Sequence, residues 1–260
     1  MTARNLIRKL LLQFSIEVRR IRPKSPNLMV EMAKPPEIPI AIWDVVIGIH
    51  GSQLTMVSLE RLIATANSAI YVCKNDIPGA FVECGVWRGG NAILAKKIFE
   101  YFGKENKVYL YDTFDGMVPP TTADFSQSIG SAEEIYASKE ANGEKWCLAS
   151  VDDVLENFNQ FAASLSNVMI VKGDVLETLG FSENIPEQIA ILRLDTDWYE
   201  STKHEMQVLY PLVVSCGILM FDDYGFWGGH QKAIDEYFLE RDLNPHMSYV
   251  DESCRLIIKL

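Results

Sequence analysis

The sequence predicts an α/β fold in which helices cover both faces of a doubly wound, mainly parallel sheet of seven strands. Short apolar runs of strand length alternate along the chain with longer segments whose apolar residues recur at helical spacing. The last two strands follow each other without an intervening helix, which predicts an antiparallel C-terminal edge. The chain has 260 residues, of which 48% are hydrophobic, enough for one large domain.

The expected elements begin at about residue 55. The first helix should end near Asn75, since Pro78 follows and proline cannot continue a helix. Helices are expected at 55–75, 91–101, 132–139, 151–162, 201–214 and 231–239, and strands at 80–84, 108–112, 167–171, 189–194, 217–221, 247–250 and 254–258.

Two segments fall outside this alternation. Five prolines between Pro23 and Pro39 predict an extended linker, so residues 1–54 are expected to form a helical arm and a Pro-rich linker, and residues 55–260 the folded domain. Residues 113–149 show weak periodicity and follow a strand end. A long insertion at that position is typical of a lid over a binding site.

The N-terminal segment has a charge pattern of its own. Residues 1–24 contain seven basic residues and a single acidic one, Glu17, and their apolar residues recur at helical spacing. This pattern predicts an amphipathic helix that packs on the domain or on a second subunit, or else contacts an anionic membrane surface. No stretch has the length of a transmembrane helix.

Charge and cysteine content exclude some classes of protein. A net charge of -11 argues against binding of nucleic acid, which requires a clustered basic surface. The five cysteines are scattered and lack C-x-x-C spacing, which indicates free thiols in a reducing compartment. We therefore expect a cytoplasmic protein.

Four carboxylates lie directly after two apolar strands. Asp195 and Asp197 follow the strand at 189–194, and Asp222 and Asp223 follow the strand at 217–221. Repulsion and desolvation would drive protons onto some of these groups unless a cation lay among them. Because carboxylate oxygens suit hard divalent ions, the cluster predicts a Mg²⁺ site.

A glycine-rich turn follows the strand at 80–84. Its sequence is Glu83-Cys-Gly-Val-Trp-Arg-Gly-Gly90, and Trp87 replaces the central glycine that a dinucleotide pyrophosphate requires. S-adenosylmethionine has no phosphate and fits this turn better. The expected cofactor-binding residues are Gly85, Gly89 and Gly90, with Glu83 facing the amino-acid portion, Asp112 the ribose hydroxyls and Asp174 the adenine amino group.

Two of these acidic residues have alternative structural roles. Glu83 could pair with a cation of the protein, and Asp174 could cap the helix that follows it. His230, beside two glycines at a helix start, is a second candidate base with a structural alternative. The aromatic residues near the acidic cluster could stack on a sugar ring or pack in the core; they are Trp198, Tyr199, Tyr224 and Trp227.

Several stretches together resemble the macrocin O-methyltransferase-like family, which methylates sugar or phenol hydroxyls of natural products. They are Phe81-Val-Glu-Cys-Gly-Val-Trp-Arg-Gly-Gly90, Asp112-Thr-Phe-Asp-Gly116, Leu192-Arg-Leu-Asp-Thr-Asp-Trp-Tyr-Glu-Ser-Thr202, Leu209-Tyr-Pro211 and Asp222-Asp-Tyr-Gly225.

The resemblance implies a Rossmann-like class I methyltransferase fold, S-adenosylmethionine as donor, Mg²⁺ as cofactor and commonly a homodimer. It places metal ligands at Asp195, Asp222 and Asp223 and a general base at Asp197. Thr196 stands where glycine is more usual in that family.

The expected activity is therefore donor- and metal-dependent O-methylation of a hydroxyl of a sugar or related natural product, with a phenolic acceptor as the alternative. Asp197 would remove the proton before in-line methyl transfer. Other classes remain open. Asp195-Thr-Asp197 is also the D-x-D pattern of metal-dependent glycosyltransferases. A dinucleotide oxidoreductase is disfavoured because Trp87 replaces the central glycine of the turn. A non-catalytic domain would have lost some of the four aspartates, and all four are present.

Overall fold

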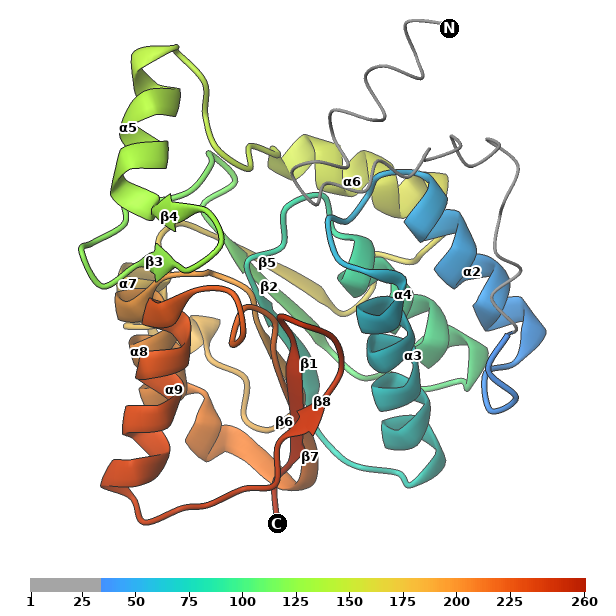
Figure 1. Cartoon of the computed structure of the whole chain (residues 1–260). Helices are drawn as coiled ribbons and strands as arrows, with labels where there is room; N and C mark the ends of the chain where they lie inside the picture. The colour runs from blue at the N-terminus through green and yellow to red at the C-terminus, as the bar shows by residue number, and fades with distance from the viewer. Residues whose placement is uncertain (1–33) are drawn as a thin grey trace, which may run out of the picture. The chain divides into compact units, whose positions relative to one another are not determined.

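The computed structural model of the chain describes residues 34–260. The basic helix predicted near the N-terminus lies outside these residues. Residues 36–260 form one compact unit around a seven-stranded sheet with the strand order β5-β2-β1-β6-β7-β9-β8 (Figure 1). No helix among the described residues is long and apolar enough to cross a membrane.

The sheet confirms the predicted fold class. Strands β5, β2, β1, β6 and β7 are parallel, while β9 runs antiparallel to β7 and β8 antiparallel to β9. The strands are β1 (Ala80–Cys84), β2 (Val108–Asp112), β5 (Val168–Lys172), β6 (Ile189–Leu194), β7 (Val213–Phe221), β8 (Ser248–Tyr249) and β9 (Arg255–Ile258).

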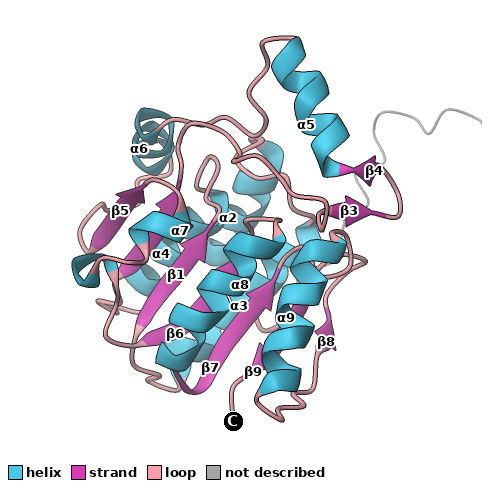
Figure 2. Cartoon of the chain, turned by 90° about the vertical axis from the view of Figure 1, so that its left-hand side faces the viewer, coloured by secondary structure: helices cyan, strands magenta, loops and turns pink. Residues whose placement is uncertain are grey.

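Helices cover both faces of this sheet (Figure 2). Successive residues of β1 enter different cores, since Phe81 packs with α2 (Ile40–Gly51), α3 (Leu59–Lys74) and α4 (Gly90–Tyr101), and Val82 packs on the opposite face. This alternation explains why the parallel strands are apolar throughout. The opposite face is covered by α7 (Val175–Thr178), α8 (Tyr199–Val208) and α9 (Gly228–Glu240), and α6 (Val151–Gln160) packs beside α4.

Two helix predictions need correction. The sequence analysis placed residues 40–54 in the arm and linker, but α2 forms there and buries Ile42, Val46 and Ile49 in the core. The helix expected at 201–214 ends earlier, because Pro211 lacks an amide hydrogen and enters a short 3-10 helix (Tyr210–Leu212) before β7 begins.

The insertion after β2 contains a small hairpin and a helix. Its elements are β3 (Phe125–Ser126), β4 (Gly130–Ser131) and α5 (Ala132–Ala141), which lie beyond the carboxyl ends of the sheet strands (Figure 2). Ser131 caps α5 by accepting a hydrogen bond from the amide of Glu134. The predicted helix at 132–139 is therefore present, and the hairpin before it is an addition.

Candidate functional site

A cavity of about 500 Å³ lies at the carboxyl ends of β1, β2, β6 and β7. Parallel strands bring all their carboxyl ends to one edge, so residues distant in sequence meet there. Its lining includes the predicted residues Glu83, Gly85, Gly90, Asp112, Asp174, Asp195, Asp197, Asp222 and Asp223, and also Arg61, Met117, Ile129, Trp146 and Trp227.

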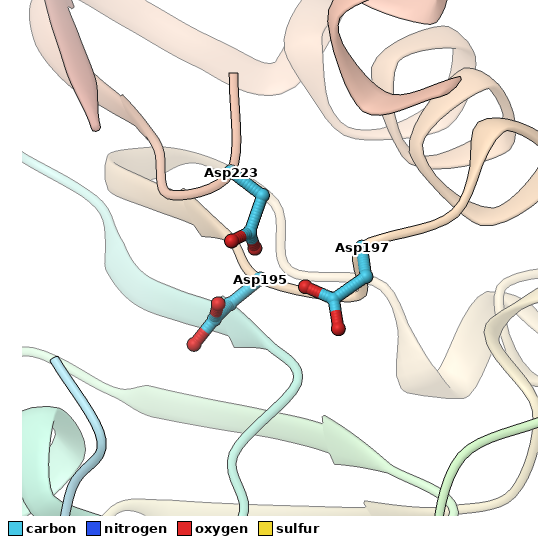
Figure 3. A group of neighbouring side chains, drawn as sticks. All are labelled: Asp195, Asp197 and Asp223. Atoms are coloured by element: carbon cyan, nitrogen blue, oxygen red, sulfur yellow. The ribbon is translucent and has the colours of Figure 1, made fainter. Parts of the chain in front are cut away.

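The compact acidic cluster consists of Asp195, Asp197 and Asp223 (Figure 3). One carboxylate oxygen from each lies within 4.8 Å of the others. The strand pairing extends beyond the strands themselves, since the amide of Asp195 donates to the carbonyl of Cys84 at 2.8 Å. Asp197 has a φ of 66°, a left-handed conformation that is uncommon for residues other than glycine.

Burial and mutual repulsion favour protonation in this cluster. Burial first, then the charges of Asp195 and Asp222, raise the pKa of Asp197 to about 7. Burial also raises the pKa of Asp195 and of Asp223 well above the usual range, although Arg193 opposes the effect at Asp195. A cation among the three carboxylates would offset both the cost of their burial and their mutual repulsion.

Asp222 lies next to this cluster but points toward two arginines. Its Oδ1 accepts a hydrogen bond from Arg193 and its Oδ2 one from Arg61, both at 2.6 Å. Burial would raise the pKa of Asp222, but the two guanidinium groups outweigh it and lower the pKa. Asp197 therefore occupies the place in the compact cluster that the sequence analysis assigned to Asp222.

The donor set fits a hard divalent cation. Each of the three carboxylates offers an oxygen, the ligand type that Mg²⁺ prefers. Oδ2 of Asp223 is buried, and no N–H or hydroxyl group within residues 34–260 donates a hydrogen bond to it. A buried oxygen without a donor is costly, and a coordinated cation would satisfy it.

Close backbone approaches explain the glycines of the turn after β1. Gly85 has a φ of 84°, and a Cβ there would overlap the carbonyl of Asp195. Gly89 is the N-cap residue of α4 and has a φ of 85°, and a Cβ at Gly90 would lie 2.7 Å from the carbonyl oxygen of Leu54. Gly85 thus sets the distance between the glycine-rich turn and the acidic cluster.

Asp112 holds this turn in place. Its Oδ2 accepts hydrogen bonds from the amides of Val86 and Trp87 at 2.7 and 2.9 Å, and its Oδ1 accepts one from Phe114 at 2.8 Å. Carboxylate oxygens have two acceptor sites each, so Oδ2 is filled and Oδ1 has one site beyond its bond to Phe114, with the hydroxyl of Thr113 at 3.3 Å.

Glu83 is a buried carboxylate with one free oxygen. Its Oε1 accepts a hydrogen bond from Arg193 at 2.9 Å, and its buried Oε2 accepts none from any group of the described chain. Burial raises the pKa of Glu83 to about 7, against the opposing charge of Arg193. The alternative in which Glu83 pairs with a cation of the protein is present, but only for one of its two oxygens.

Asp174 and His230 have structural partners. Asp174 caps α7 by accepting from the amide of Leu176 at 2.9 Å, while also lining the cavity. His230 lies fully buried in α9, where its Nδ1 is 2.9 Å from the hydroxyl of Thr202. Burial lowers the pKa of His230 to about 3, and the residue is not part of the cavity lining.

Two arginines that the sequence did not indicate as site residues, Arg193 and Arg61, bond the aspartates. Arg193 lies in the middle of the apolar run of β6 and is almost fully buried. It bonds Glu83, Asp195 and Asp222, which come from three strands. Arg61 on α3 is held by Asp251, through Nε at 2.7 Å. The signal for Arg193 was an arginine between two leucines in a strand that is otherwise apolar.

Three tryptophans connect the insertion to the acidic edge. Trp146 lies in the insertion, and its ring is 5.7 Å from Trp198 and 6.2 Å from Trp227, with edge-to-face geometry in both pairs. Trp198 is almost entirely buried and donates through Nε1 to the carbonyl of Val118 at 3.0 Å. All three tryptophans line the cavity, so their rings pack against one another and also face the space in which a ligand would bind.

The strand order and the glycine-rich turn beside an acidic strand end define a class I methyltransferase fold. Residues 50–258 match the model of the macrocin O-methyltransferase (TylF) family, and the chain belongs to that family. It is therefore an S-adenosylmethionine-dependent O-methyltransferase.

Similar proteins act in natural-product biosynthesis. The chain is 29% identical over 198 residues to demethyldecarbamoylnovobiocin O-methyltransferase of Streptomyces niveus, a match that covers 76% of this chain and 72% of that one. It is equally identical, with the same coverage, to an 8-demethyl-8-(2,3-dimethoxy-α-L-rhamnosyl)-tetracenomycin-C 4'-O-methyltransferase of Streptomyces olivaceus. The solved structure of the O-methyltransferase NovP aligns with a TM-score of 0.68 at 27% identity, covering 79% of this chain and 81% of that one.

Proposed function

We propose that this O-methyltransferase uses Mg²⁺ and transfers the methyl group to a hydroxyl of a sugar carried by a natural product. The observation that carries the proposal is the cluster of Asp195, Asp197 and Asp223 in the same cavity as the glycine-rich turn. Donor and acceptor sites in one cavity allow the methyl carbon and the hydroxyl oxygen to be aligned.

The donor would lie against the turn after β1. Oε2 of Glu83 is free to accept from the ammonium group of the methionine portion, and Oδ1 of Asp112 would accept from a ribose hydroxyl in place of the contact with Thr113. Asp174 lines the cavity at the end of β5, where the adenine would lie. Gly85 and Gly90 contribute close backbone contacts, and Gly89 is the N-cap of the helix that follows.

Asp195 and Asp223 are the residues that would hold the cation most directly. Asp222, the third expected ligand, would join them by exchanging its bond to Arg61 for the cation. A bound divalent ion makes an adjacent hydroxyl easier to deprotonate and orients it. In this arrangement Arg193 stabilises Asp195 and Asp222 from below without entering the cavity, since it is almost fully buried.

Asp197 would receive the acceptor proton. Its carboxylate lies at the cavity wall, with one oxygen within 4.8 Å of an oxygen of Asp195 and of Asp223, so it could accept a proton from a hydroxyl held beside these two residues. The left-handed backbone at Asp197 turns the chain directly into α8, which fixes the carboxylate relative to Asp195. His230 is excluded from this role by its burial outside the cavity lining.

The acceptor side of the cavity is aromatic and apolar. Trp146, Trp227, Met117 and Ile129 form a surface suited to a sugar face together with an apolar aglycone. The named acceptor of the Streptomyces olivaceus relative carries a rhamnosyl group. We therefore place a deoxysugar glycoside first, and a phenolic acceptor second.

The test is methyl transfer from labelled S-adenosylmethionine to a panel of deoxysugar glycosides and phenols, with Mg²⁺ or with EDTA. We expect a methylated sugar hydroxyl that requires Mg²⁺, and a loss of about a hundredfold or more in kcat for Asp197→Asn. The matched control is Asp115→Asn, because Asp115 is exposed, pairs with Lys145 and lies outside the cavity lining.

Undiminished transfer in EDTA would contradict the metal role, and a product methylated on a phenol would replace the sugar acceptor. We also propose that the protein is a cytoplasmic homodimer and that its basic N-terminal segment makes peripheral contact with a membrane. Sedimentation and vesicle flotation of the full chain would test the dimer and the membrane contact.

A further inference from the structure

Asp124 is a buried carboxylate that the proposed chemistry does not use. It lies in the insertion, directly before β3, with only 1% of its surface exposed. A carboxylate is rarely buried unless its oxygens are fully bonded. The hydrogen-bond partners of Asp124 therefore indicate its structural role.

The two oxygens of Asp124 bond to different parts of the molecule. Oδ2 accepts from the amide and the hydroxyl of Thr121, at 2.8 and 3.0 Å, and closes the local turn of the insertion. Oδ1 accepts from the amide of Tyr199 at 2.8 Å. Tyr199 is the first residue of α8, where backbone amides lack helical partners and favour a negative charge.

Gly229 provides the space for this carboxylate. It is the second residue of α9 and has no left-handed φ that would demand glycine. A Cβ at Gly229, however, would overlap Oδ1 of Asp124 and lie 3.2 Å from the carbonyl oxygen of Ala123. The glycine is therefore explained by the close approach of the insertion, not by the helix.

Further hydrogen bonds connect the Asp124 contact to α5 and to the segment that contains Trp198. The carbonyl of Asp124 accepts from the amide of Ala132, where α5 begins. Trp198, between Asp197 and Tyr199 in sequence, donates to the carbonyl of Val118 in the insertion. The segment that carries the candidate base is thus joined to the insertion at two adjacent residues, Trp198 and Tyr199.

We propose that Asp124, the amide of Tyr199 and the open space at Gly229 form a clasp that fastens the insertion onto the N-terminal ends of α8 and α9. Asp124 is then a positioning residue. It acts through the insertion and Trp198 to keep the acceptor side of the cavity formed beside Asp197. The inference deepens the proposed function and, for its catalytic consequence, rests on it.

The clasp itself is tested without catalysis, by amide hydrogen exchange of Asp124→Ala, Gly229→Ala and the double variant. Each single variant should speed exchange across residues 117–131 by about tenfold or more, while exchange in β1 and β6 stays within about twofold. The two changes should not be additive. Once the carboxylate is gone, the methyl group at Gly229 meets only the carbonyl oxygen of Ala123 at 3.2 Å, and the double variant should be close to Asp124→Ala.

Two control variants separate the clasp from general effects. Glu133→Ala removes an exposed carboxylate in the first turn of α5, and Gly51→Ala adds a methyl group to a helical glycine that has open space around it. Both should leave exchange at 117–131 within about twofold of the wild type. Unchanged exchange in Asp124→Ala, or additive effects in the double variant, would overturn the proposal.

The catalytic consequence is measured with the acceptor found in the panel. Asp124→Ala should raise the acceptor KM by about tenfold with little change in the KM for S-adenosylmethionine, because the clasp borders the acceptor side alone. Asp124→Asn should recover part of the loss, since its amide oxygen still accepts from Tyr199. Equal changes in both KM values would overturn the positioning role. If no methyl transfer is found but exchange responds as expected, the clasp stands and the proposed function fails.

Discussion

Arg193 donates a hydrogen bond to Asp222 at 2.6 Å, from a side chain that is 1% exposed to one that is 2% exposed. The same guanidinium bonds Glu83 at 2.9 Å and Asp195 at 2.6 Å. Because these acids lie at the ends of β7, β1 and β6, one buried cation links three strands below the cavity. The positive charge of Arg193 thus offsets the negative charges at the acidic edge of the sheet.

Replacing Arg193 by methionine should destabilise the fold by about 3–5 kcal/mol, because the buried Glu83 and Asp222 and the partly buried Asp195 would lose their common partner. The free energy of unfolding in urea measures the effect. The matched control is Lys232→Met, since Lys232 forms an exposed i,i+4 ion pair with Glu236. That change should cost less than about 1 kcal/mol. Equal costs for both variants would show that Arg193 is not the structural counter-charge.

The stabilisation by Mg²⁺ should grow with pH. In the absence of a cation, the pKa values of Asp195, Asp197 and Asp223 are raised in the folded protein, so the folded state binds more protons than the unfolded state from about pH 4 upward. Stability of the metal-free protein therefore falls as the pH rises through the value of about 7 for Asp197. A cation favours the ionised carboxylates and competes with these protons.

Thermal unfolding with and without Mg²⁺, at a series of pH values from about 6 to 8, measures this competition. The increase in melting temperature should be larger at the upper end of the range and should shrink in Asp223→Asn. Asp115→Asn is the control, because that carboxylate is exposed and pairs with Lys145. A Mg²⁺ effect that does not depend on pH would exclude the three aspartates as its origin.

Gly85→Ala should be far more damaging than Gly103→Ala. Both glycines have a positive φ, of 84° and 64°, so both substitutions carry a similar backbone cost of about 1 kcal/mol. Only at Gly85 would the new Cβ overlap a carbonyl, that of Asp195, while nothing lies near Gly103. Calorimetric binding of S-adenosylhomocysteine should be lost in Gly85→Ala and retained in Gly103→Ala. Similar binding by both variants would mean that the turn tolerates displacement.

The sequence predicted the sheet well because its strands are short, apolar and separated by polar turns. The predicted bounds of β1, β2 and β6 match the structure residue for residue. The helix α2 was missed because its sequence is apolar around most of its circumference and follows prolines, so it shows little helical periodicity. Periodicity reports only elements that have one polar and one apolar face.

The candidate site could be predicted from the sequence only in part. The sequence placed Asp195, Asp197, Asp222 and Asp223 at one edge, because strand ends of a parallel sheet meet there. It could not tell which of them would meet an arginine. Arg61 reaches Asp222 from α3, across 161 positions of sequence, and only the folded chain brings the two together. Long-range ion pairs of this kind leave no local pattern.

The hydroxyl of Thr196 contacts the buried Glu205 of α8, at 3.0 and 3.1 Å from the two carboxyl oxygens. Burial raises the pKa of Glu205 to about 8, so the folded protein retains this proton in a range where the unfolded chain has released it. Between about pH 5 and pH 8 this group makes stability fall as pH rises, by up to about 1.4 kcal/mol per pH unit.

Glu205→Gln should remove this dependence, because the amide is neutral at every pH in the range. The difference in unfolding free energy between Glu205→Gln and wild type, measured in urea, should therefore rise from about pH 5 to pH 8 in favour of the variant. The contributions of the three cavity aspartates are common to both proteins and cancel in the difference. Glu200→Gln changes an exposed glutamate in the first turn of the same helix and should give no such trend. Parallel curves for Glu205→Gln and wild type would show that Glu205 titrates near its ordinary pKa and that Thr196 does not bond a neutral acid.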